Sequence, residues 1–342
     1  MKIIRPYKVR DANLTASSIS EALPAPWFSA ILYRTDELVQ ASGTVYRSLQ
    51  DDNQDHAPAS SPLWWVVQSY GAYSGATTYA EGDIVYSTAT HHEYQSMVAG
   101  NVGQALTDPS KWLDLGFNNR WRMLDQSNTS QSAALEQISV SIAVTGRADS
   151  VALLNIVGAS VRIQMTTVED GEIFDETFSL VSDSGINTWF EYFFEPIVRR
   201  GDFIATDLPL NGNPTITVTL DEPGGLAMIG TLVVGQKRDF GDLLHGARVG
   251  IQDYSRKVAD DFGNYTIVER AFSKRASFKV AIDNDQIDAI VAMLSQYRAT
   301  PVVYIGSDKY ASTWIYGFYR DWGNDIDYPT VSYLSLEIEG LT

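Results

Sequence analysis

Cysteine is absent from this chain of 342 residues. Its absence excludes disulfide bonds, thiolate chemistry and zinc sites with cysteine ligands, and it fits folding in a reducing cytosol. No run approaches the roughly 20 apolar residues of a membrane-spanning helix. Residues 1–6, MKIIRP, lack the apolar stretch and small-residue cleavage site of a signal peptide. We therefore expect a soluble globular protein that is neither exported nor inserted into a membrane.

Positive charge is scarce, because 25 Lys and Arg face 42 Asp and Glu, which gives a formal net charge of −17. An acidic face repels a phosphate backbone, so the balance argues against sequence-specific binding to nucleic acid. Two interpretations stay open. Either the acidity keeps the protein soluble, or an acidic wall lines a passage through which DNA slides without sticking.

Helical periodicity is also rare. Short segments rich in β-branched or aromatic residues alternate with a period of two at 138–144, 160–168, 172–181, 189–197 and 215–220. We therefore predict a mainly β protein. The clearest helix covers residues 284–298, where apolar residues recur at helical spacing and Asp283 or Asn284 can cap the first turn. A second short helix is expected near 239–245.

A length of 342 residues suits two to four domains. Changes in composition divide the chain into an extended arm (1–20), two small aromatic-rich modules (21–70 and 71–117), a region with enough strands for a jelly-roll-like β-sandwich (118–236) and a region of strands around one helix (237–342). The arm has few apolar anchors of its own. We expect it to add to another domain or subunit as an extended strand.

The two modules carry the same small pattern. Without a gap, residues 46–64 align with residues 94–112, and the matched pairs are Tyr46 with Tyr94, Ser48 with Ser96, Leu49 with Met97, Asn53 with Asn101, and Trp64 with Trp112. In the second copy, Gly82-Asp83 separates two alternating runs and predicts a strand, a turn and a strand. So small a unit has a small core, to which a few Tyr and Trp rings would contribute most of the burial.

The second copy resembles the small three-stranded chitin-binding type of carbohydrate-binding module, on the residues Tyr79, Gly82-Asp83, Val85, Tyr94, Pro109 and Trp112. The first copy has the residues Tyr33, Val39, Tyr46, Pro62 and Trp64-Trp65, but DEL stands where Gly-Asp is expected, so it looks like a degenerate copy. The resemblance implies carbohydrate binding on exposed rings, with the candidates Trp65, Tyr79, Trp64 and Trp112. The alternative is a pure docking module with these rings in its core. We expect Trp112 and Trp64 to be core residues and Trp65 to be exposed.

Several further stretches resemble a family of tailed-bacteriophage structural proteins in which the same order follows chitin-binding-like modules. They include residues 152–165, 249–278 and 316–342. The resemblance implies a virion tail protein of the distal-tail or minor-tail type, made in the host cytoplasm and placed near the tail tip or baseplate. It further implies that residues 237–342 form a tail-tube-like or distal-tail-like, β-barrel-like assembly domain that builds a homo-oligomeric ring. The implied partners are other tail or baseplate proteins and host cell-surface glycans.

Motifs for catalysis are weak. The triplet DFG at 239–241 and 261–263 lacks the other kinase motifs, and His91-His92 lacks the spacing of a zinc protease site. Residues 283–288, DNDQID, lack the Gly and Glu of a calcium loop. Glu191 and Glu195 are the best carboxylate pair for glycoside hydrolysis, but an ordinary strand surface accounts for them. We predict no catalytic residue, no metal site and no cofactor.

Three functions follow from these observations. The leading one is a non-enzymatic structural component of a phage tail tip or baseplate. The alternatives are a receptor-binding or adhesin protein that grips host polysaccharide on aromatic platforms, and a glycan hydrolase.

Overall fold

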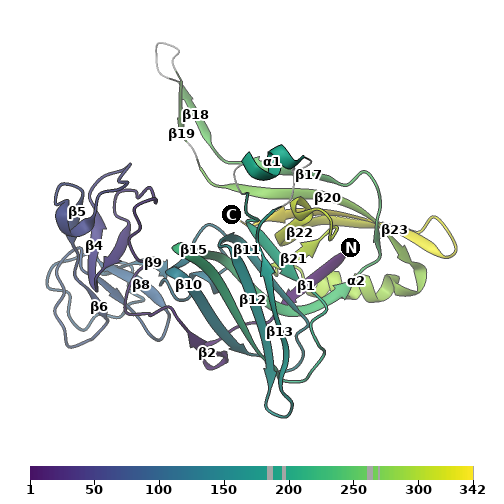
Figure 1. The fold of residues 1–342 in the computed structure, drawn as a ribbon, viewed down its shortest axis with the longest axis horizontal. Coiled ribbons are helices and arrows are strands. Elements are labelled where there is room, and N and C mark those ends of the chain that lie inside the picture. The colour runs from purple at the N-terminus through teal and green to yellow at the C-terminus, as the bar shows by residue number, and fades with distance from the viewer. Residues whose placement is uncertain (183–187, 195–197, 260–264, 269, 342) are drawn as a thin grey trace.

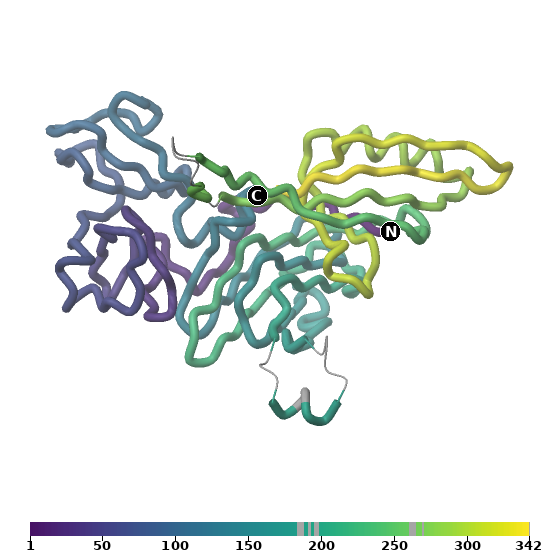
Figure 2. Tube along the Cα trace, turned by 90° about the horizontal axis from the view of Figure 1, so that it is seen from above, coloured from purple at the N-terminus to yellow at the C-terminus, as the bar shows by residue number. Residues whose placement is uncertain are grey.

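The computed structural model describes residues 1–182, 188–194, 198–259, 265–268 and 270–341. Its strands form one 14-stranded antiparallel sheet, a three-stranded sheet, a four-stranded sheet and a separate two-stranded hairpin. The prediction of a mainly β protein is confirmed. Figures 1 and 2 show the two small sheets together at one end of the molecule and the C-terminal strands at the other. No described helix is long and apolar enough to cross a membrane.

The two small sheets belong to the two modules. The first has the antiparallel order β3 (Leu38–Ala41), β4 (Thr44–Ser48) and β5 (Trp65–Val67), with a 3₁₀ turn at Pro58–Ser60. The second has the order β6 (Tyr70–Ala72), β7 (Ile84–Tyr86), β8 (His92–Ser96) and β9 (Trp112–Phe117). It has four strands where three were expected, because the segment that joins the modules pairs in parallel with β7.

The central lobe contains β10 (Ser132–Ala143), β11 (Ser150–Val157), β12 (Ser160–Thr167), β13 (Gly171–Ser179), β14 (Asp202–Ala205) and β15 (Thr215–Asp239). The strands predicted at 138–144, 160–168, 172–181 and 215–220 are therefore confirmed, although β10 begins earlier and β15 extends much further than predicted. The 25-residue strand β15 pairs in turn with β10, β12, β11 and the N-terminal strand. Buried side chains from the other central strands form one large apolar core, and partly buried side chains of β13 pack against it.

The strand predicted at 189–197 is wrong. Residues Trp189–Phe194 form a short helix, α1, and residues 195–197 lie outside the described residues. Aromatic rings four residues apart meet on one side of a helical turn. The ring centroids of Trp189 and Phe193 lie 6.3 Å apart, and those of Phe190 and Phe194 lie 4.8 Å apart. In this helix the aromatic rings therefore pair with rings four residues away, and not with side chains of a neighbouring strand as the predicted strand would have required.

The C-terminal lobe contains β16 (Asp242–Leu243), β17 (Arg248–Asp253), β20 (Phe272–Asp283), β21 (Val302–Ile305), β22 (Trp314–Asp325) and β23 (Val331–Gly340). Between β17 and β20 stands the separate hairpin of β18 (Arg256–Ala259) and β19 (Tyr265–Val268). The described strands form an open sheet and do not close into a barrel. The short helix expected near 239–245 is wrong, because that stretch ends β15 and forms β16.

The predicted C-terminal helix is confirmed as α2 (Ile287–Gln296), which follows a 3₁₀ turn at Asn284–Gln286. Its buried residues Ile290 and Leu294 pack into the core of the C-terminal lobe. Neither expected cap is made: Asp283 has no capping hydrogen bond, and the Asn284 side chain donates to the carbonyl oxygen of Tyr328 instead. Further 3₁₀ turns lie at Asp11–Asn13, Arg122–Leu124 and Ala311–Thr313.

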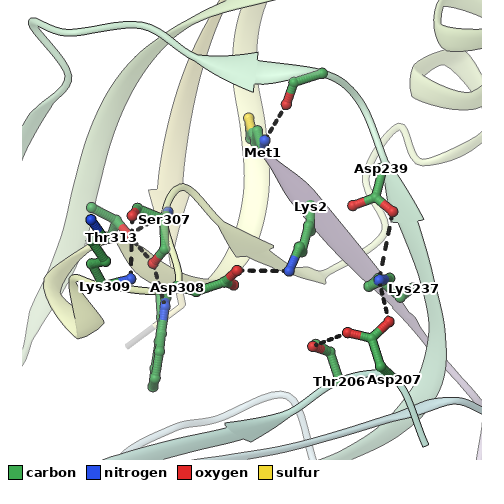
Figure 3. A network of polar contacts seen from close by, with 12 residues as sticks. Met1, Lys2, Thr206, Asp207, Lys237, Asp239, Ser307, Asp308, Lys309 and Thr313 are labelled. Atoms are coloured by element: carbon green, nitrogen blue, oxygen red, sulfur yellow. Dashed lines mark hydrogen bonds and ion pairs between the residues drawn. The ribbon is translucent and has the colours of Figure 1, made fainter.

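The N-terminal arm is a strand inside the large sheet. Strand β1 (Lys2–Pro6) pairs antiparallel with the end of β15 on one side and with β21 on the other. A second arm strand, β2 (Leu14–Ser17), pairs with β10. Figure 3 shows the surroundings of β1, where the Lys2 ammonium lies 2.7 Å from an Asp308 carboxylate oxygen. The expected strand addition thus takes place within this chain, to its own central and C-terminal lobes.

The two faces of β1 belong to two different cores. Ile3 packs with Phe240, Phe278 and other residues of the C-terminal lobe. Ile4 points the other way into a smaller cluster that joins β1, β11, β15 and β21. Both side chains are fully buried. Because successive side chains of a strand alternate in direction, one short strand contributes to both cores at once.

Shortening a buried side chain of β1 should destabilise the chain as a whole. We expect Ile4→Ala to lower the free energy of unfolding by about 2–5 kcal/mol, because it leaves a cavity in a fully buried cluster. The matched control is Ile326→Ala, at a side chain that is 67% exposed, with an expected change within about 0.5 kcal/mol. Urea unfolding followed by circular dichroism measures both. Equal midpoints for the two variants would contradict the central role of β1.

Candidate functional site

Each module is built around one buried tyrosine and one buried tryptophan. In the first module, the ring centroids of Tyr33 and Trp65 lie 5.3 Å apart at an interplanar angle of 71°. In the second, those of Tyr79 and Trp112 lie 5.4 Å apart at 72°. All four residues are at most 7% exposed. Edge-to-face packing of large rings therefore forms the centre of both modules.

A buried asparagine ties the loops of each module together in the same way. Asn53 donates its side-chain N–H groups to the Ser48 hydroxyl at 2.9 Å and to the carbonyl of Trp64, the residue before Trp65, at 3.3 Å. Asn101 donates to the Ser96 hydroxyl at 3.0 Å and to the carbonyl of the residue before Trp112 at 3.2 Å. Both asparagines also exchange two main-chain hydrogen bonds with the central tyrosine of their module.

These contacts correct the ungapped alignment of the two copies. Ser48 pairs with Trp65 across β4 and β5, whereas Ser96 pairs with Trp112 across β8 and β9. Trp65, and not Trp64, is therefore the counterpart of Trp112. The loop between the asparagine and this tryptophan is one residue longer in the first copy. An alignment without a gap cannot include that extra residue.

The first copy keeps the geometry of the second despite its different turn residues. Asp36 takes the left-handed conformation of Gly82, with φ of 68° against 89°. Aspartate is one of the few residues with a side chain that tolerates this region. Glu37 then replaces Asp83, because each carboxylate accepts a hydrogen bond from the backbone N–H three residues earlier, at 3.1 Å and 2.7 Å. The copy that looked degenerate is structurally intact.

The four candidate sugar-binding residues differ in accessibility. Trp112 is buried, as expected, and Tyr79 is buried beside it. Trp65 was expected to be exposed, yet it lies in the core and donates its indole N–H to the His56 carbonyl at 2.7 Å. Trp64 was expected in the core, yet it is only partly buried and stacks on the His56 ring at 3.8 Å. Of the four, Trp64 alone presents ring surface to solvent.

A polar cluster fixes the second module to the central lobe. The buried Glu93 carboxylate accepts a hydrogen bond from the Tyr70 hydroxyl at 2.8 Å and lies 3.3 Å from the Arg122 guanidinium. Burial, followed by the charge of Glu93, raises the pKa of Tyr70 far above its ordinary range. Nearby, the ring of His91 stacks on Trp121 with centroids 4.0 Å apart. The module is held against the body by desolvated contacts.

A metal-binding cluster is not found among the described residues. No three His, Asp or Glu side chains gather there as a metal site requires. His91 and His92 contact different carboxylates, those of Glu21 and Asp114. Of the carboxylate pair considered for hydrolysis, Glu195 and the side chain of Glu191 lie outside the described residues.

Comparison with known proteins adds no relative. No protein-family model matches the chain, and no curated protein matches it.

The buried tyrosine of the first module makes the stability of that module depend on pH in the alkaline range. Burial raises the pKa of Tyr33 to about 12, while its hydroxyl accepts a hydrogen bond from the Phe28 N–H at 2.8 Å. The folded state favours the neutral phenol, so this stabilisation is complete below the unfolded pKa of about 10 and is lost as pH rises toward about 12.

We therefore expect the first module to lose stability between about pH 10 and pH 12, and Tyr33→Phe to reduce that dependence. Hydrogen exchange cannot be followed easily at this pH, so near-ultraviolet circular dichroism is the measurement. Tyr310→Phe, at an exposed position, is the control. Identical alkaline profiles for the wild type and Tyr33→Phe would contradict the assignment.

Proposed function

We propose that this chain is a non-enzymatic structural component of a phage tail tip or baseplate, which assembles with copies of itself and with other tail proteins. The observation that carries the proposal is an apolar β-hairpin that projects from the body. The resemblance of residues 152–165, 249–278 and 316–342 to tail proteins supports the same conclusion.

The hairpin of β18 and β19 extends away from the large sheet (Figure 1). Every described residue of its two strands is exposed. Ile267 is 74% exposed and Tyr265 is 61% exposed, and Lys257 lies over the Tyr265 ring at 3.5 Å. An isolated two-stranded hairpin is marginally stable in water. A hairpin with apolar side chains on both faces is therefore suited to burial against a partner.

An open sheet edge lies at the base of this hairpin. Strand β17 pairs with β20 and with no other described strand, and its Val249 and Ile251 side chains are exposed. An unpaired edge offers main-chain N–H and C=O groups to a second chain. At the far end of the same sheet, β13 carries Glu172, Asp175 and Glu176, and such charges discourage uncontrolled pairing. The β17 edge is thus the better assembly surface.

We infer that residues 118–236 are a jelly-roll-like sandwich and that residues 237–342 form a barrel-like assembly domain when neighbouring copies continue the open sheet. The modules at 21–70 and 71–117 would be chitin-binding-like units that decorate the outside. Strand β1, from the 1–20 arm, would then be the structural link between sandwich and assembly domain.

Self-association tests the proposal. We expect the full chain to form oligomers of one dominant size, and Ile251→Asp and Ile267→Asp each to raise the dissociation constant at least about tenfold by placing a charge in the interface. Val168→Asp, at a fully exposed turn, is the matched control and should change nothing. Sedimentation velocity over a concentration series measures all four proteins. A strictly monomeric wild type that also fails to bind any tail protein would overturn the proposal.

Glycan binding by the first module is a second candidate function, favoured by the partly exposed Trp64. We expect Trp64→Ala to abolish weak retention on chitin oligosaccharides while lowering the free energy of unfolding by about 1 kcal/mol or less. Trp65→Ala is the contrast, with an expected loss of about 3–5 kcal/mol from the module core. Thermal melts and affinity electrophoresis separate the two effects. Undiminished retention by Trp64→Ala would remove this ring as a sugar platform.

A further inference from the structure

A cleft of about 610 Å³ lies where the first module, the central lobe and the C-terminal lobe meet. Its volume is within the range of pockets that hold small molecules. The first module contributes Arg34, and the central lobe contributes Asn128, Asn155 and Asp202. The C-terminal lobe contributes residues from β20, from the segment just before it and from β22; those used below are Arg270, Phe272, Lys274, Trp314 and Tyr316.

The cleft is locally positive in a chain with a net charge of −17. Three cationic residues and one carboxylate line it. That carboxylate, Asp202, is already engaged: one oxygen lies 2.5 Å from the Lys274 ammonium, and the other accepts the backbone N–H of Asn155 at 3.0 Å. Two positive charges, those of Arg34 and Arg270, are therefore in excess.

The two arginines are available for a ligand. Among the described residues, neither guanidinium takes part in an ion pair. Asp51 interacts electrostatically with Arg34, but its Oδ1 atom accepts hydrogen bonds from the Thr35 backbone N–H at 2.9 Å and from the Thr35 hydroxyl at 3.0 Å. Arginine presents a planar fork of donors that suits carboxylate and phosphate groups.

The rest of the lining suits a sugar. Phe272 is exposed, and the partly buried Trp314 and Tyr316 line the same cleft, so aromatic surface is available for the apolar face of a ring. Asn128 and Asn155 place amide groups at the same cleft, and the Asn155 side chain is positioned by a 2.7 Å hydrogen bond to the Asn128 carbonyl. Amides can both donate to and accept from hydroxyl groups.

We propose that this cleft binds an anionic saccharide, a sugar that carries a phosphate or a carboxylate. The acidic group would lie between Arg34 and Arg270, and the sugar ring would lie toward the aromatic side chains. Such a ligand would contact the first module and the C-terminal lobe at the same time. The site depends neither on self-association nor on the ring of Trp64.

Calorimetric titration of the full chain tests the proposal with four probes: glucose 6-phosphate, glucuronic acid, glucose and inorganic phosphate. We expect both acidic sugars to bind, and glucose and inorganic phosphate to bind at least about tenfold more weakly than glucose 6-phosphate. Higher salt should weaken binding of the acidic sugars. Glucose binding as tightly as glucose 6-phosphate would overturn the role of charge, and phosphate binding as tightly would overturn the role of the sugar.

Matched variants locate the site. Arg34→Ala and Arg270→Ala should each weaken glucose 6-phosphate binding at least about tenfold, and Arg270→Lys should restore part of the loss because it keeps the charge without the fork. Arg298→Ala, at an exposed position just after α2 and outside the cleft, is the control. An equal loss in Arg298→Ala would overturn the assignment. Sedimentation of the same samples shows assembly separately, so the two proposals can fail independently.

Discussion

Insertion of β1 between β15 and β21 is the contact on which the rest of the structure depends. The strand supplies main-chain hydrogen bonds to the central lobe on one edge and to the C-terminal lobe on the other. Its Ile3 and Ile4 side chains enter two different apolar clusters. Because no disulfide can join the lobes, this shared strand and the length of β15 keep them in one continuous sheet.

The modules show how one geometry tolerates two sequences. A tyrosine, a tryptophan and an asparagine make the same packing and hydrogen bonds in both copies, while Asp36-Glu37 replaces Gly82-Asp83 at the turn. Burial concentrates the aromatic residues in the core, so ring content alone does not indicate sugar binding. Trp64, which is only partly buried, takes the place of Lys111, the residue just before the buried tryptophan of the second module.

The chain combines buried contacts that hold its parts together with surfaces that are open to solvent. The buried Glu93 and its partner Arg122 hold the second module on the central lobe, and breaking such a pair would leave an uncompensated buried charge. By contrast, the β17 edge and the hairpin of β18 and β19 leave apolar and main-chain groups open to a partner. The assembly that we propose would use these open groups.

Local patterns in the sequence determined the β class, the strands at 138–144, 160–168, 172–181 and 215–220, the helix at 287–296 and the presence of two related modules, because periodicity and turn residues act over a few positions. The tertiary structure decided which tryptophan points inward, since a one-residue change of register reverses every side chain of a strand. It also decided the helix at Trp189–Phe194, the position of β1 and the convergence of Arg34 with Arg270. The positions of β1 and the two arginines depend on contacts between residues far apart in the chain, which no local pattern records.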